Sequence, residues 1–177
     1  MFPAPFPAPS GFPAAARLLA PAPDCRFCHL ARVTVAGHLD ALEAWNAVMA
    51  RRLPGFALAV RIRDAISARF GVERIGGFSG AQHRAIAAGE KLDFFLVEEA
   101  RPERLLLTAR DRHLDVMTCV TATPCDGGTE VAITSSVITH NLFGRLYMLP
   151  VGPAHRLIVA AMLHRLRRQR ARATQAH

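Results

Sequence analysis

The sequence predicts an α+β domain in which a curved antiparallel β-sheet wraps around a long C-terminal α-helix. Alternating apolar and polar residues in the second half of the chain predict several strands with short connections. Apolar residues three or four positions apart near the C-terminus predict a long helix with one buried face. The chain of 177 residues is about one domain long, so we expect a single core.

The first 24 residues are rich in Pro, Ala and Phe and predict an extended N-terminal arm, residues 1–24. Prolines recur too often for an apolar helix, and no basic residue precedes them, so the segment is a poor secretory signal. Its phenylalanines could dock the arm on the domain or on a partner subunit. The alternative is a disordered leader. We therefore expect a cytoplasmic protein with reduced cysteines.

A cysteine motif follows the arm. Cys25, Cys28 and His29 spell CRFCH, which has the C-x-x-C-H spacing of covalent haem attachment. However, HLARVTV alternates like a strand, on which thiols three positions apart point to opposite faces. A zinc site shared with Cys119 and Cys125 is a second alternative. The sequence favours reduced, partly buried thiols, and we expect no cofactor.

Two short helices are predicted after this first strand. Residues 39–53 carry one apolar stripe and end at a Pro-Gly pair. Apolar residues four positions apart at Ile62, Ile66 and Phe70 predict the second helix.

Four strands and the terminal helix complete the pattern. The strands are predicted at KLDFFLVEEA, RLLLTARDR, HLDVMTCVTAT and TEVAITSSVITH. In the terminal helix, one stripe contains His155, Val159, Met162 and Leu166, and Pro150 and Pro153 are expected to break or kink the helix. This helix is the large element left to cover the apolar face of the sheet. The arrangement is that of the helix-grip fold, with a pocket between sheet and helix.

The strand register can also be predicted. The apolar faces of the last two strands match if Val116 pairs with Val137, which also pairs His113 with His140. The opposite face then gathers four polar residues: Asp111, His113, Asp115 and His140.

These four residues could ligate a divalent metal, or a His-Asp pair could act as an oriented base. The competing interpretation is a polar outer face of the sheet, solvated or covered by the arm or a second subunit. Since the apolar face would line the pocket, we expect the cluster to lie outside it and expect no metal.

A second polar group lies where the last strand meets the terminal helix. Asn141 and Gly144 are typical turn residues. Arg145 and Tyr147 could hold a carboxylate or enolate oxygen, and His155 is either a satisfied core histidine or an anchor for a ligand. The predicted ligand-binding residues are Arg145, Tyr147, His155, Asn141 and, on the two short helices, Trp45 and Arg61.

The formal net charge is +8, and much of the excess lies in the terminal helix. The arginines there are Arg165, Arg167, Arg168, Arg170 and Arg172. They could meet phosphates or an anionic membrane surface, but cations at a helix C-terminus also interact favourably with the helix dipole. No aromatic residues interleave with them, so we expect no nucleic-acid partner. We divide the chain into the arm, one domain over residues 25–168 and a basic tail over residues 169–177, without a membrane span.

Three segments, DRHLDV, ITHNLFGRLY and PAHRLIVAAML, resemble an uncharacterised bacterial family, domain of unknown function 2867. The resemblance covers roughly residues 28 to 168. It implies membership of the START and polyketide-cyclase-like proteins, which bind lipids, hormones, polyketides and other apolar molecules, and some of which catalyse cyclisation or hydration. Relatives also occur appended to nicotinamide-dependent dehydrogenase-like modules. The resemblance implies a cavity, while the family has no settled activity.

Three functions remain open at this point. The first is binding of a small apolar or amphipathic molecule in a cavity between the sheet and the terminal helix. The second is a cyclase or hydratase type of enzyme that uses His155 or His113, with Asp115 as a further candidate, in general base catalysis. The third is a non-catalytic accessory or dimerising module, and a homodimer is left open in every case.

Overall fold

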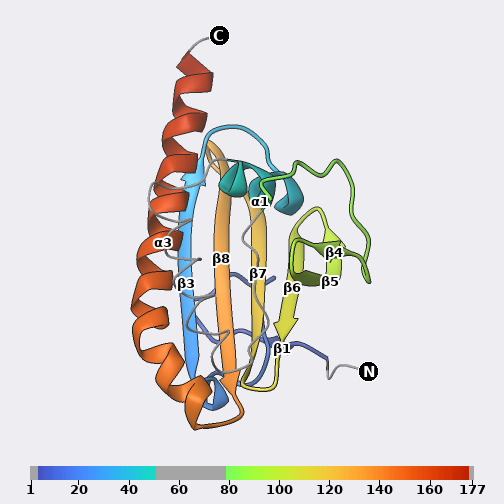
Figure 1. Cartoon of the computed structure of the whole chain (residues 1–177). Helices are drawn as coiled ribbons and strands as arrows, with labels where there is room; N and C mark the ends of the chain where they lie inside the picture. The colour runs from blue at the N-terminus through green and yellow to red at the C-terminus, as the bar shows by residue number, and fades with distance from the viewer. Residues whose placement is uncertain (1–3, 51–78, 176–177) are drawn as a thin grey trace.

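The structure is a computed structural model that describes residues 4–50 and 79–175. Its main element is a six-stranded antiparallel sheet in the order β3-β8-β7-β6-β5-β4, accompanied by a long C-terminal helix (Figure 1). The fold is therefore α+β, as predicted, and is consistent with a helix-grip arrangement. The strands of this sheet are β3 (Phe27–Val35), β4 (Lys91–Leu92), β5 (Phe95–Arg101), β6 (Arg104–Arg110), β7 (Leu114–Cys125) and β8 (Gly128–Thr139).

The predicted register of the last two strands is confirmed. Val116 of β7 pairs with Val137 of β8. Pairing continues past the strand ends, because the backbone N–H of His140 donates to the carbonyl oxygen of His113 over 2.8 Å. Alternation along both strands fixed this register, since a slip by one residue would turn every apolar side chain to the wrong face.

Helix α1 (Ala41–Met49) covers part of the sheet beside β5, β6 and β7. It begins with a capping box, in which Asp40 accepts from the backbone N–H of Glu43, and the Glu43 side chain accepts from that of Asp40. Trp45 is buried against Phe95, with ring centroids 5.9 Å apart. The second predicted helix and Arg61 lie outside the described residues.

Helix α3 (Leu142–Gln175) runs alongside the edge strand β3 and projects beyond the end of the sheet (Figure 1). Its predicted apolar stripe is confirmed, because Val159, Met162 and Leu166 are buried. The helix is continuous through Pro150 and Pro153. Proline lacks the N–H that would bond the carbonyl four residues earlier. These carbonyls belong to exposed positions of the helix, where water can solvate them.

Close packing fixes the start of α3. The side-chain oxygen of Asn141 accepts from the backbone N–H of Gly144 over 3.0 Å, as an N-cap does. A Cβ atom at Gly144 would overlap the carbonyl oxygen of His113. Glycine is therefore required there by the close approach of the helix to β7.

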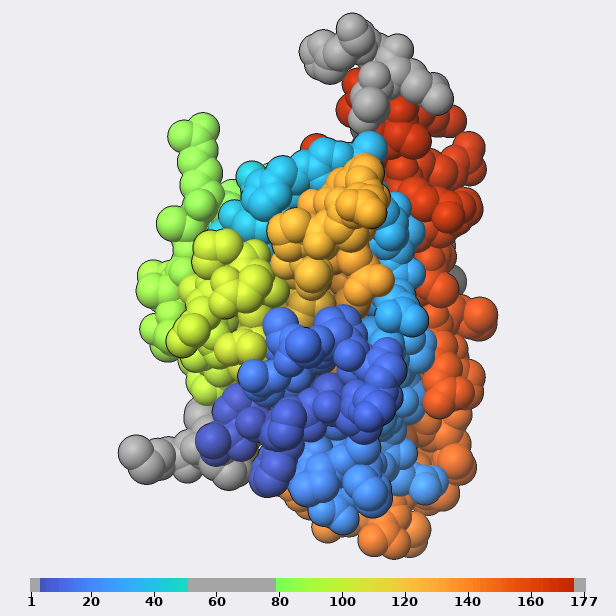
Figure 2. Space-filling view, turned by 180° about the vertical axis from the view of Figure 1, so that it is seen from behind, coloured from blue at the N-terminus to red at the C-terminus, as the bar shows by residue number. Residues whose placement is uncertain are grey.

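The N-terminal arm covers part of the other face of the sheet, the lower part in Figure 2. It contains a two-stranded hairpin, β1 (Phe6–Pro7) and β2 (Arg17–Leu18), and a short 3₁₀ helix, η1 (Ala22–Asp24). Leu19 packs in a buried cluster with Met117 and Cys119, and its N–H donates to the Ser136 hydroxyl over 2.9 Å. Of the alternatives for the arm, docking on the domain is the one that the structure describes.

Within the described residues, one helix has the length and composition to cross a membrane, Leu142–Ala173 of α3. Only 28% of its most apolar window is buried in the structure. Length and composition alone are weak evidence, because core helices of soluble proteins pass the same test.

Candidate functional site

A row of polar residues crosses the sheet beneath the first half of α3. His29 of β3 pairs with Ser135 of β8, which pairs with Thr118 of β7. Alternation places all three on the same side as the apolar core, facing α3. His155 of α3 reaches this row, with its Nε2 3.0 Å from the Ser135 hydroxyl. The row thus joins the sheet to the helix through polar contacts inside an apolar layer.

The two imidazoles of this row lie against each other. The ring centroids of His29 and His155 are 5.9 Å apart and the planes are nearly perpendicular, at 82°. Burial, and to a smaller extent the neighbouring His29, lower the pKa of His155 to about 4. Burial and the positive charge of Arg156 lower the pKa of His29 as well. Both rings are therefore neutral at neutral pH.

One ring nitrogen of this pair makes no hydrogen bond within the described structure. The Nδ1 of His29 is buried and has no hydrogen-bond partner among the residues that the structure describes. An unpaired buried polar atom costs roughly 1–3 kcal/mol. A bound molecule with a suitable polar group would remove this cost.

An open groove of about 240 Å³ lies between α3 and the start of β3. Phe27 lines this groove and also contacts both histidines, with its ring centroid 5.6 Å from that of His155 and 6.1 Å from that of His29. The guanidinium carbon of Arg156 lies over the Phe27 ring, 5.3 Å from its centroid. A Cβ atom at Gly152 would lie 3.2 Å from the Phe27 ring, so glycine keeps the helix close here. The groove is lined by Arg26, Phe27, Met148, Leu149, Gly152, Pro153 and Arg156.

The predicted ligand-binding residues are spread over the molecule. Arg145 is exposed, and Tyr147 is half-buried, with its ring stacked on that of Phe143 at 6.1 Å. Asn141 caps α3, and Trp45 lies on α1. Of the described members of this predicted set, His155 is the one that lies in the polar row.

The predicted outer cluster divides into separate contacts. Asp115 meets His140 at 3.1 Å and Arg110 at 3.6 Å. Asp111 instead accepts the backbone N–H groups of His113 and Leu114, as in a turn. In the described part of the chain, no group of three or more His, Cys, Asp or Glu residues could hold a metal ion.

His113 takes part in the junction between β7 and α3. Its Nε2 lies 2.9 Å from the donating Nε of Arg112. Its Nδ1 lies 2.9 Å from the Nδ2 and 3.2 Å from the Oδ1 of Asn141, so this nitrogen meets the side-chain amide. Both nitrogens are therefore engaged in holding the turn.

The cysteines are free thiols. Burial raises the pKa of Cys25 and of Cys28, and raises that of Cys119 to about 11. The Cys25 thiol lies 3.5 Å from the Ala20 carbonyl oxygen, to which it donates. Protonated thiols of this kind are poor nucleophiles and poor metal ligands.

Comparison with known proteins supports one conclusion about family. A solved structure with some similarity is that of an uncharacterized protein from Rhizobium leguminosarum, which is 14% identical in sequence. That match covers 78% of this chain and 97% of the other, with a TM-score of 0.35. No curated protein matches the chain. The family model described as "Protein of unknown function (DUF2867)" matches residues 21–162, so the chain belongs to the DUF2867 family.

Proposed function

We propose that the protein binds a small amphipathic molecule between the sheet and α3. The observation that carries the proposal is the pair of half-buried neutral imidazoles, in which His155 is bonded to Ser135 and His29 has a buried, unpaired Nδ1. A polar group of the ligand would bond His29, and its apolar part would pack on Phe27 and Met148 of the adjoining groove. Apolar walls with a few fixed polar groups are typical of small-molecule sites.

The charge around the groove favours an anionic polar group. Arg26 and Arg156 both line it, and arginine forms strong, paired hydrogen bonds with carboxylates. The START-like placement implied by the sequence resemblance agrees with a ligand of this amphipathic kind. The free thiols agree with a reducing compartment, and we infer a cytoplasmic protein.

The geometry favours binding over catalysis by the predicted bases. A general base works best when its pKa lies near the working pH, whereas burial keeps the pKa of His155 near 4. Both ring nitrogens of His113 are engaged by Arg112 and Asn141. Asp115 lies on the opposite side of the sheet, between His140 and Arg110.

Calorimetric titration with octanoate and octanol tests the proposal, because the two probes share an alkyl chain and differ in charge. We expect octanoate to bind more tightly. Arg156→Gln should weaken octanoate binding roughly tenfold, because a hydrogen bond to a charged group is lost. It should leave octanol binding unchanged. His29→Phe keeps an aromatic ring but removes the buried nitrogen, and should weaken both probes.

Arg172→Gln is the matched control, because this arginine is exposed near the far end of the same helix. Native mass spectrometry of protein purified from its own host then identifies any retained molecule. If neither probe binds and no molecule is retained, the proposal is wrong. It is equally wrong if both probes bind His29→Phe as tightly as the original protein.

A further inference from the structure

Helix α3 has an apolar side that no part of the described structure covers. Leu142, Leu146, Leu149 and Leu157 are 69%, 55%, 58% and 73% exposed. Their spacings of four, three and eight residues place them on one side of the helix. The opposite side packs into the core through Met148 and Val159, so this helix carries apolar residues on both sides between Leu142 and Val159.

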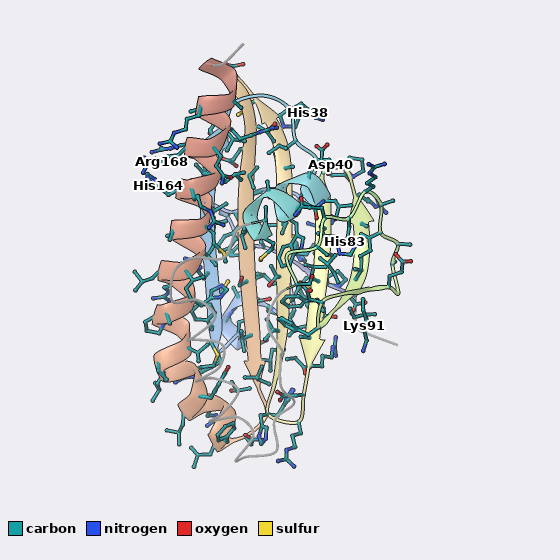
Figure 3. All side chains as sticks on the ribbon, turned by 45° about the horizontal axis from the view of Figure 1, so that its top comes forward. His38, Asp40, His83, Lys91, His164 and Arg168 are labelled. Carbon is teal, nitrogen blue, oxygen red and sulfur yellow. The ribbon has the colours of Figure 1, made fainter. Side chains whose placement is uncertain are left out.

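The charge of α3 is entirely positive. Its sequence from Leu142 to Gln175 contains seven arginines and neither Asp nor Glu. Arg165 and Arg170 donate to the carbonyl oxygens of Val48 and His38. Figure 3 shows Arg168 and His164 pointing away from the sheet. The exposed arginines of the helix are Arg145, Arg156, Arg167, Arg168 and Arg172.

We propose that the outward side of α3 docks on an anionic membrane surface. We define this docking face as the exposed leucines Leu142, Leu146, Leu149 and Leu157 and the exposed arginines of the helix. Exposed leucines can enter the boundary between headgroups and acyl chains, and arginines attract anionic lipids. The proposal does not rest on the proposed ligand, although Leu149 and Arg156 belong to the groove as well.

Charge and burial argue against other occupants of this face. A second copy would bring two arginine-rich helices together without an acidic residue on either helix to pair with them. A membrane-spanning α3 would have to leave the sheet, exposing Val159, Met162 and Leu166. A nucleic acid offers phosphates for the arginines but no apolar phase for the four leucines. An anionic bilayer surface satisfies both parts of the face.

Vesicle sedimentation of the full chain tests this proposal. We expect binding to equimolar phosphatidylcholine and phosphatidylglycerol, and much weaker binding to phosphatidylcholine alone. The double variant Arg167→Gln, Arg168→Gln should lose about 30-fold in affinity, at about fivefold for each arginine near the surface. Leu157→Glu should lose roughly tenfold or more, because it removes an apolar contact and adds a negative charge.

Glu43→Gln is the control, since this exposed residue on α1 lies outside the docking face and should bind as the original protein does. Equal binding to both kinds of vesicle or no binding to either would overturn the proposal. Resistance to alkaline carbonate extraction would also overturn it, because it indicates a spanning helix. Light scattering measures the oligomeric state. If the protein is a dimer that Leu157→Glu converts to a monomer, and it does not bind vesicles, the face joins two copies instead. Octanoate titration of the arginine double variant measures binding in the groove. It therefore distinguishes a failure of the membrane proposal from a failure of the ligand proposal.

Discussion

His155 is the residue at which the packing of α3 has the clearest chemical consequence. Its ring lies half-buried between helix and sheet, and the loss of solvation there lowers its pKa to about 4. A histidine in the unfolded chain has a pKa of about 6.5. Between these two values the unfolded chain binds a proton that the folded protein does not, so stability is fully present above about pH 6.5 and falls as the pH drops toward 4.

Replacing His155 should flatten this dependence on pH. In urea unfolding between these pH values, His155→Gln should reduce the slope of the unfolding free energy against pH by about 1.4 kcal/mol per pH unit. This is the contribution of one proton that the unfolded chain binds and the folded protein does not. The size follows from the loss of one group that titrates differently in the two states. Fluorescence-monitored unfolding at several pH values measures it.

Ser135→Ala provides the control for the hydrogen bond. It removes the hydroxyl that meets the Nε2 of His155 but keeps the buried ring. It should cost about 1 kcal/mol at neutral pH and retain the original slope. An unchanged slope in His155→Gln would contradict the assignment of the acid sensitivity to this histidine.

The sequence placed His155 correctly on the buried stripe but did not connect it with His29. The missing information is the pairing of β3 with β8, which joins segments about a hundred residues apart. Alternation predicts which face of a strand is apolar, but it does not say which distant strand lies beside it. The groove residue Phe27 was missed for the same reason.

At the scale of elements, the arm is part of the packing of the sheet. Leu18 is fully buried, and Arg104 of β6 donates to the Ala15 carbonyl oxygen over 3.1 Å. The sequence left docking and disorder as alternatives, because proline-rich segments have no periodicity from which a buried face could be identified. The contacts of the arm are made with side chains of distant strands.

Truncation of the arm's most buried side chain should therefore destabilise the protein. We expect Leu18→Ala to lower the free energy of unfolding by roughly 2–4 kcal/mol, because it leaves a cavity at a fully buried site. Phe6→Ala, at a partly exposed position in the same hairpin, should cost less than 1 kcal/mol. Urea unfolding of both variants measures the difference, and equal effects would argue against a docked arm.

For the whole molecule, the two ends of α3 contact different apolar clusters. Met148 packs with Phe27 and Val137, whereas Leu166 packs in the cluster that contains Trp45 of α1. The sequence predicted one core because of its length, and it predicted one helix covering the sheet. A continuous α3 that joins both clusters is the physical reason to expect one cooperative unit.

Trp45 is the single tryptophan of the chain and reports on the cluster beneath α1. We expect Met148→Ala, in the other cluster, to destabilise the protein by roughly 2–4 kcal/mol through the cavity it leaves. If the fold unfolds as one unit, the transition in Trp45 fluorescence should shift by the same amount as the transition in circular dichroism. Leu142→Ala, at an exposed position of the same helix, should shift neither by more than about 0.5 kcal/mol. A fluorescence transition that stays in place in Met148→Ala would instead mean that the two clusters unfold independently, despite the helix they share.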